Sequence, residues 1–378
     1  MMAKLLQLCA RDTGHAAMYS QLEQLLAGLQ KTATDASWNQ TLYEAEHQGL
    51  APLLYKHLNH IGLGPVPKQF KRMLQSLFLR NRNAAGIRNQ AMQEILIAYA
   101  AAGIQVLLVK GIALANFAYS DPGLRPMRDI DLLVSEDKLF QAQDILHDLG
   151  WQVQDHDIPS DYYHLPPLVK TIDGLPVAIE LHRNLLPYQA RYPRWPFEKS
   201  WGTAHAGTIG GRDFHTLCLE ETLRSVYLHG FQAPLTYEPF RLIHVADMLT
   251  LTEKYLDAMN WENVRAEEPI LPAVISRLHF LTPLPETVIS RLQLDIRRKP
   301  KGVGLPYSGW PRRRLEDTDK KDLMQLAKDT LWPSAWWMQI YHGHLAGFFY
   351  WKARFWEHPK MLLRWAIDYY LAEIKKQK

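Results

Sequence analysis

The run Asp129-Ile-Asp-Leu-Leu-Val134 holds two acids, two positions apart, in an otherwise apolar stretch. Side chains of a β-strand alternate between its faces, so a strand here places Asp129 and Asp131 on the same side. Neighbouring carboxylates repel each other unless a cation neutralises them. Mg²⁺ binds one or two carboxylates together with phosphate oxygens and water. We therefore predict a metal platform on this strand, with a solvated strand edge as the alternative.

The residues before this strand add cations. Ile104 to Val109 is a mostly apolar run typical of a buried strand, and Lys110-Gly111 follows it and opens a short helix. Glycine allows close approach of a ligand, a helix N-terminus favours anions, and lysine can hold a phosphate as a point charge. Arg125 and Arg128 precede the acids. Cations that alternate with acids along the chain fit a triphosphate with its metal ion, because the phosphates need positive groups and the metal needs negative ones. In the alternatives, Lys110 is a solvated strand end and the arginines pair with the aspartates.

A third acid is expected if two metal ions act together, because such sites clamp the attacking and leaving oxygens. Glu180 fits this role as the lone acid of an apolar strand that follows the turn Asp173-Gly174. His182 shares its strand face by the same alternation. We expect the Glu180 carboxylate to face Asp131 across adjacent strands, and three clustered acids to raise one another's pKa. Alternatively, Glu180 ends its strand in solvent.

Periodicity and turn residues predict an α+β fold, with a mixed sheet flanked by helices. Residues 1–102 are helical, residues 103–216 form the α/β core, and residues 217–378 are helical again with a basic loop near 295–320. Within the core we expect a strand at 129–134, a helix at 136–149 and a strand at 151–154. Asp173-Gly174 and Gly210-Gly211 mark hairpins.

Composition excludes several classes of protein. The 378 residues are 47% hydrophobic and 22% charged with a net charge of +4, which indicates a globular chain without an overall bias for nucleic acid. Two cysteines far apart give neither a disulfide framework nor a zinc ribbon. The first apolar run is too short for a secretory leader, and no run is long enough to span a membrane. We therefore expect a cytoplasmic protein.

Several polar and aromatic residues outside the core stay open to more than one interpretation. His244 and Asp247 favour a hydrogen bond on one helix face, although with His229 they could line an acceptor or base pocket. His342, His344 and His358 lie among aromatic residues and favour packing or surface roles. The basic triplets at 297–299 and 312–314 favour solvated loops over RNA contacts. The C-terminal aromatics favour a helical core or partner interface over base stacking or a membrane surface; they are Trp332, Trp336, Trp337, Phe348, Phe349, Tyr350, Trp351, Phe355 and Trp356.

Three segments together resemble the uncharacterised nucleotidyltransferase family of bacteria, within the DNA polymerase β-like superfamily. They are Leu108-Val-Lys-Gly-Ile-Ala-Leu-Ala-Asn-Phe-Ala-Tyr119, Arg125-Pro-Met-Arg-Asp-Ile-Asp-Leu-Leu-Val134 and Ile179-Glu-Leu-His182. The specific likeness covers about residues 104–182. Lys110-Gly111 stands where the superfamily usually has Gly-Ser, as expected of this particular family.

The resemblance implies transfer of a nucleoside monophosphate from an NTP to an acceptor hydroxyl, with release of pyrophosphate. Carried across, Asp129, Asp131 and Glu180 are the catalytic and metal-binding acids for Mg²⁺ or Mn²⁺. Lys110, Gly111, Arg125 and Arg128 would contact the nucleotide phosphates. A small-molecule acceptor is favoured over protein or tRNA. The alternative from another class is a catalytically silent NTP-binding or scaffold module, against which the intact acids argue.

Overall fold

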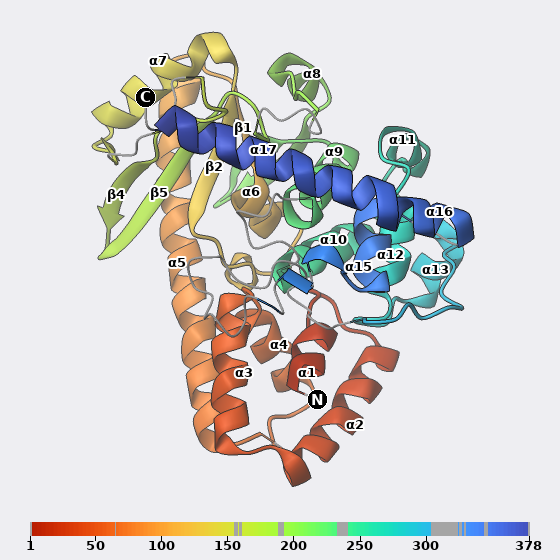
Figure 1. Ribbon diagram of the computed structural model, residues 1–378. Helices are drawn as coiled ribbons and strands as arrows, with labels where there is room; N and C mark the ends of the chain where they lie inside the picture. Colours follow the sequence, from red (N-terminus) through yellow and green to blue (C-terminus); the bar gives the residue numbers. More distant parts are fainter. Residues whose placement is uncertain are drawn as a thin grey trace. The chain divides into compact units, whose positions relative to one another are not determined.

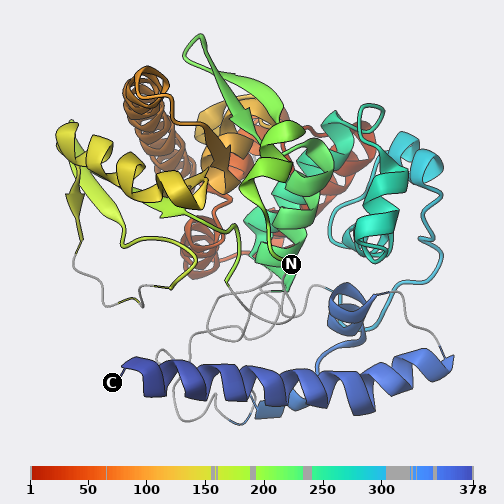
Figure 2. The ribbon, with the colours of Figure 1, turned by 90° about the horizontal axis from the view of Figure 1, so that it is seen from above.

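The computed structural model describes the backbone of residues 2–64, 66–154, 158, 161–187, 193–232, 241–303, 324, 327–328, 330–343 and 347–376. It divides into two compact units. One unit is Leu42–Ser225, and the other combines Met1–Thr41 with Val226–Lys378. Figures 1 and 2 show the ribbon from two directions.

A mixed sheet forms the centre of the unit Leu42–Ser225. Within the described residues it has seven strands in the order β3-β4-β5-β2-β1-β7-β6. The pairs β2–β5 and β1–β7 are parallel, and the other pairs are antiparallel. The strands are β1 Val106–Val109, β2 Asp129–Val134, β3 Gln152–Val153, β4 Leu168–Ile172, β5 Leu175–His182, β6 His205–Ile209 and β7 Arg212–Thr216.

The sequence places the central strands in the core. All four residues of β1 are buried, as are the five residues of β2 that follow Asp129. Continuous apolar runs of this kind suit strands that are covered on both faces. The predicted strand at 129–134 is therefore confirmed with its bounds, and the α+β fold with a mixed sheet and flanking helices is confirmed with it.

Both predicted hairpins are present. Asp173 and Gly174 join β4 to β5 with φ of 48° and 77°, and Gly210 and Gly211 join β6 to β7 with φ of 56° and 80°. Two-residue hairpin turns need positive φ at both central positions, which explains these residue pairs. The first turn fixes the register of β5 and hence the position of Glu180.

Helices flank the sheet in sequence. The longest is α5, the long orange helix of Figure 1, which lies in the region 1–102 that the sequence predicts to be helical. The predicted helix at 136–149 starts as a 3₁₀ turn and becomes α-helical at Leu139. The helical elements of this unit are α4 Ala51–His60, α5 Lys68–Ala101, α6 Lys110–Phe117, η1 Pro122–Leu124, η2 Glu136–Lys138, α7 Leu139–Asp148 and α8 Phe197–Gly202.

The other unit joins the two ends of the chain. Arg11 is fully buried and its Nη2 lies 2.8 Å from Glu253 Oε1, while Lys4 Nζ donates to the carbonyl of Leu281 at 2.8 Å. The division falls within α3 Asp35–His47 and α9 Leu219–Phe231. The remaining helical elements are α1 Met2–Leu8, α2 Ala16–Thr32, α10 Leu242–Lys254, α11 Trp261–Glu267, α12 Leu271–Leu278, α13 Glu286–Leu292, α15 Ala335–His342, α16 Gly347–Lys352, the π-helical η4 Ala353–Glu357 and α17 His358–Lys376.

Some expectations from the sequence are not decided by this arrangement. All strands found among the described residues lie within 103–216, but the three-part division at 102/103 and 216/217 stays a prediction. Most of the predicted basic loop, including the triplet 312–314, lies outside the described residues. Cys9 and Cys218 are free, as expected. Among the described residues, no helix combines the length and apolar character needed to cross a bilayer.

Close packing of η1 against α5 generates a first prediction. A Cβ on Gly123 would lie 2.7 Å from Arg82 Cα, a backbone atom that cannot move aside. Gly123→Ala should therefore lower the free energy of unfolding by about 1–3 kcal/mol. Gly86→Ala on exposed α5 surface, where nothing lies within 4 Å, is the control. It should be neutral or stabilising by up to about 1 kcal/mol. Urea denaturation measures both, and equal effects would contradict the packing argument.

Candidate active site

The parallel pairing of β2 with β5 brings the acids of the two strands together. Asp131 lies directly opposite Glu180 in the register, so both side chains leave the same face of the sheet. Asp129, two residues before Asp131, and His182, two residues after Glu180, share that face. The predicted approach of Glu180 to Asp131 across adjacent strands is confirmed.

Lys110 provides the first countercharge. It follows β1 as the first residue of α6, and its Nζ donates to Asp131 Oδ1 at 2.6 Å. Its φ of 52° lies in the left-handed region, which is unusual for a residue with a side chain. The interpretation of Lys110 as a solvated strand end is therefore wrong. Its ammonium is held inside the acid cluster at the junction of strand and helix.

His182 provides a second partner for both acids. Its Nε2 lies 2.9 Å from Asp131 Oδ1 and 3.3 Å from Glu180 Oε2, and the side chain is fully buried. Its Nδ1 is also buried and has no hydrogen-bond partner among the described residues. Alternation along β5 had placed His182 on this face, whereas its bond to Asp131 depends on the pairing of the strands.

Sequence reasoning missed two residues near the acids. His164 forms an isolated bridge with His182, and its Nε2 lies 3.8 Å from Glu180 Oε2. Arg88 on α5 is buried, its Nε has no hydrogen-bond partner among the described residues, and it interacts electrostatically with Asp129. Neither residue lies in a recognisable motif. The one sequence signal for Arg88 was a charge on the apolar face of a helix.

The pKa of Asp129 is raised, whereas the pKa values of Asp131 and Glu180 are lowered. Asp129 behaves as predicted for clustered carboxylates, because burial and the charge of Asp131 raise its pKa to about 6. Asp131 and Glu180 do not. Burial alone would raise their pKa, but Lys110 and His182 hold the pKa of Asp131 below its usual value, and His182 does the same for Glu180. The charge of Asp131 raises the pKa of both Asp129 and Glu180, as expected, but at Glu180 the contact with His182 outweighs it.

The same balance affects the basic groups. Burial lowers the pKa of His182, but its hydrogen bonds to Asp131 and Glu180 outweigh that effect and raise it. Burial likewise lowers the pKa of Lys110, and the charge of Asp131 reverses the direction. The cluster is thus a buried network in which the Lys110 ammonium contacts Asp131, and His182 Nε2 contacts both Asp131 and Glu180.

The other residues predicted to contact the nucleotide phosphates differ in their surroundings. Gly111 is packed closely, and a Cβ there would lie 2.7 Å from Arg125 Nη1. Arg125 itself donates to the carbonyl of Pro126 at 3.1 Å. Arg128 is exposed. The absence of a side chain at Gly111 therefore lets Arg125 approach the start of α6, beside Lys110.

The donor set fits a divalent cation. Asp131, Glu180 and His182 each offer one ligand atom, and these atoms lie within 4.8 Å of one another. Asp129 lies outside this group, although its charge interacts with Asp131. Two carboxylates and one imidazole are common metal ligands. The structure thus joins two of the three predicted acids with a histidine.

Residues considered outside the core have ordinary roles. His244 Nδ1 lies 3.9 Å from Asp247 Oδ2 on one face of α10, so the two side chains are neighbours as predicted, at a distance longer than that of the expected hydrogen bond. The rings of His342 and His358 pack against Trp337. His344 lies outside the described residues. None of these groups forms a metal cluster within the described part of the chain.

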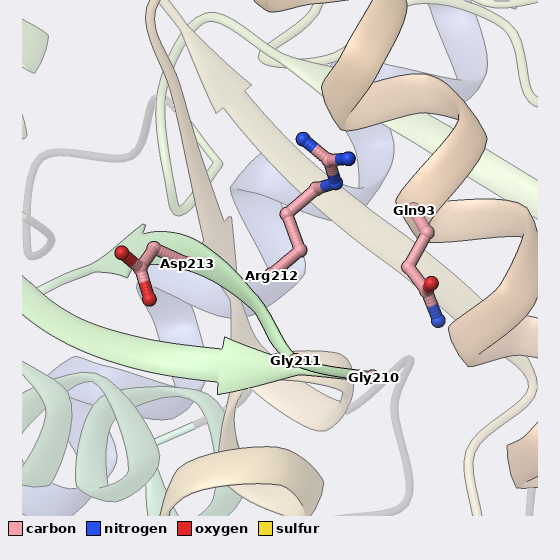
Figure 3. Close-up of a pocket in the computed structure, with 5 residues that line it drawn as sticks. All are labelled: Gln93, Gly210, Gly211, Arg212 and Asp213. Carbon is pink, nitrogen blue, oxygen red and sulfur yellow. The ribbon is translucent and has the colours of Figure 1, made fainter.

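A separate hollow lies between α5 and the β6–β7 hairpin. Figure 3 shows Gln93 pointing from the helix toward the glycines of the turn. The hollow has a volume of about 420 Å³ and contains none of the predicted site residues. It is lined by Gln93, Gly210, Gly211, Arg212 and Asp213.

Comparison with known proteins gives a family match. A family model described as an uncharacterised nucleotidyltransferase matches residues 34–270, well beyond the stretch 104–182 that carries the sequence motifs. Curated proteins gave no match.

Three solved structures are similar in part. The crystal structure of ANT(2″)-Ia in complex with adenylyl-2″-tobramycin is 19% identical with a TM-score of 0.33, over 48% of this chain and 95% of that one. A solution structure of the antibiotic-resistance factor ANT(2″)-Ia is 17% identical with a TM-score of 0.33, over 51% and 97%. An antigenic nucleotidyltransferase-like protein from Paracoccidioides brasiliensis is 14% identical with a TM-score of 0.28, over 56% and 96%.

The raised pKa of Asp129 generates a prediction about stability. Because the folded pKa of about 6 exceeds the ordinary 3.8, ionisation opposes folding. The stabilising contribution is complete below pH 3.8 and is lost as pH rises through about 6. Asp129→Asn cannot ionise, so the metal-free variant should be more stable than the parent by about 1–3 kcal/mol at pH 7 and equal to it near pH 3.8.

Thermal unfolding in chelator across this pH range measures the difference. Asp137→Asn is the matched control, because Asp137 is an exposed acid in η2. The stability of Asp137→Asn relative to the parent should not rise with pH. A constant difference between Asp129→Asn and the parent at every pH would contradict the assignment.

Proposed function

The chain belongs to the uncharacterised nucleotidyltransferase family, and from this we propose that it transfers a nucleoside monophosphate from an NTP to an acceptor hydroxyl, releasing pyrophosphate. The observation that supports this proposal most is the facing pair Asp131 and Glu180 on parallel strands, with Lys110 beside them. The reaction needs anionic metal ligands next to a cation for phosphate, and this face of the sheet supplies both.

We assign the divalent ion to the predicted acids, joined by a histidine. Asp131 and Glu180 would hold Mg²⁺ or Mn²⁺ together with His182, since their ligand atoms lie within 4.8 Å of one another. Asp129, two residues before Asp131 on the same strand face, would complete the predicted set of acids. When bound, the ion neutralises charge on the triphosphate and on the departing pyrophosphate. Asp131 or Glu180 would accept the proton of the acceptor hydroxyl as general base.

Lys110 has a different role before and after the nucleotide binds. In the metal-free cluster its ammonium neutralises Asp131 at 2.6 Å. If Asp131 held a divalent ion, that ion would supply the countercharge, and the Lys110 ammonium would be available to a phosphate oxygen. Gly111, Arg125 and Arg128 are assigned to the same phosphates, because Arg125 packs against Gly111 and Arg128 directly precedes Asp129.

The acceptor is proposed as a small molecule rather than protein or tRNA. The net charge of +4 gives the chain no general attraction for polyanions. A cytoplasmic location belongs to the same proposal. A catalytically silent NTP-binding module is the competing function, and it is distinguished by whether transfer occurs.

Transfer is tested with each α-labelled NTP and Mg²⁺ or Mn²⁺ in the presence of cell extract. The parent should label one fraction of the extract. Asp131→Asn should reduce the rate by roughly 100-fold or more, because it removes a ligand and possible base. Asp137→Asn, the same change at an exposed acid, should leave the rate unchanged. NTP binding without labelling under any condition would favour the silent module.

His182 generates a prediction about the metal. Imidazole nitrogen suits transition metals, whereas Mg²⁺ takes oxygen ligands. His182→Gln should therefore weaken Mn²⁺ binding by roughly 10-fold or more and change Mg²⁺ binding much less. Titration calorimetry with each ion measures this, with His60→Gln on the exposed end of α4 as the control. Equal losses for both ions would show that His182 only holds the carboxylates in place.

A further inference from the structure

The last helical segment exposes an apolar face. The elements α16, η4 and α17 follow one another without a break from residue 347 to residue 376 and form one rod, drawn in blue in Figure 2. Phe348 is 76% exposed, and Phe355, Trp356 and Tyr370 are each more than 60% exposed. Phe349 is also exposed, at 65%, but follows Phe348 directly and so points about 100° around the helix from it. We call seven other exposed apolar residues of this rod the outer face; they are Phe348, Trp351, Phe355, Trp356, Leu363, Ile367 and Tyr370.

The opposite face of the rod is anchored to the segment that precedes it. Arg354 is buried, lies 4.4 Å from the ring centroid of Trp332 and donates to the carbonyl of Pro333 at 2.7 Å. His358 Nε2 lies 2.7 Å from the carbonyl oxygen of Thr330. These contacts fix which side of the rod packs inward, so the exposure of the outer face follows from the rod's own anchoring.

A local change of helix type keeps the outer face in line. Residues Ala353–Glu357 form a π-helical turn, whose hydrogen bonds span five residues rather than four. The extra residue per turn resets the helical phase. Exposed apolar residues before it, at Phe348 and Trp351, therefore lie on the same side as Leu363 and Ile367 after it.

The charges along the outer face are positive. Lys352, Lys360 and Arg364 are exposed, whereas Glu357 is half-buried. These are the exposed charged groups among the described side chains of residues 347–370. Aromatic and aliphatic residues combined with Lys and Arg are typical of helices that lie in the interface of a bilayer.

We propose that the outer face lies on the surface of a bilayer that contains anionic lipids, with the aromatic side chains between the headgroups and the three cations against them. Each cation near an anionic leaflet strengthens binding by roughly fivefold. This contact is independent of the proposed transfer reaction, and it would keep the protein at a lipid surface.

Two other occupants fit the same face less well. A second copy of the chain would bring its own Lys352, Lys360 and Arg364 against those of the first, with repulsion across the symmetric contact. A nucleic acid would pair with the cations and stack on aromatic rings, but Leu363 and Ile367 have no ring on which a base can stack. An anionic bilayer can pair with the cations and can also bury the aromatic and aliphatic side chains.

Vesicle flotation with the full-length chain tests the proposal. The parent should float with mixed phosphatidylcholine–phosphatidylglycerol vesicles and much less with phosphatidylcholine alone, and added salt should weaken the binding. A variant with Phe348→Ser, Trp351→Ser and Phe355→Ser should lose binding. The matched control carries Tyr43→Ser and Phe140→Ser, which change exposed aromatics of the other unit, and should float like the parent.

Charge reversal provides a second test that leaves the apolar residues in place. Lys352→Glu, Lys360→Glu and Arg364→Glu together should weaken binding to anionic vesicles by roughly 100-fold. Circular dichroism checks that each variant stays folded. The proposal is overturned if the parent does not bind anionic vesicles or if both variants bind like the parent. It is equally overturned if the outer-face variants instead abolish self-association or RNA binding without any vesicle binding by the parent.

Discussion

The parallel register of β2 and β5 is the constraint on which the candidate site depends. It sets Asp131 opposite Glu180, and both are then held in a buried setting where repulsion between carboxylates is strong. The fold tolerates them because Lys110 and His182 enter the same space from β1–α6 and from the end of β5. Loss of either partner leaves an uncompensated buried charge, which is destabilising.

The same constraint explains why the acids are not equivalent. Lys110 and His182 contact Asp131 and hold its pKa below the usual value, whereas burial and the charge of Asp131 raise the pKa of Asp129, the first residue of β2. Burial and repulsion both disfavour the ionised form of Asp129, so the fold holds this carboxyl group where its charge is opposed. Such a conflict between stability and local charge is expected where a sequence is selected for binding rather than for packing.

The unit formed by Met1–Thr41 and Val226–Lys378 is held together by different contacts. Its N-terminal residues Lys4 and Arg11 bind residues more than two hundred positions later, Leu281 and Glu253. Its last rod is held on one side by Arg354 and His358 and presents apolar residues on the other. In the acid cluster, Lys110 and His182 contact the carboxylates directly. On the rod, cations and aromatic residues face outward together, which is why an external anionic surface is the partner that completes them.

The sequence by itself determined the elements whose signals are local. Alternation fixed β2, the Asp-Gly and Gly-Gly pairs fixed the hairpins, and the lone acid of an apolar strand marked Glu180. The tertiary structure decided the partners. Lys110 reaches Asp131, His182 bridges two acids, and Arg88 and His164 come near them from a distant helix and a loop. The periods of helix and strand are set by neighbouring residues, whereas these contacts arise from strand pairing and helix packing across long separations, and the direction of the pKa shifts follows from those contacts.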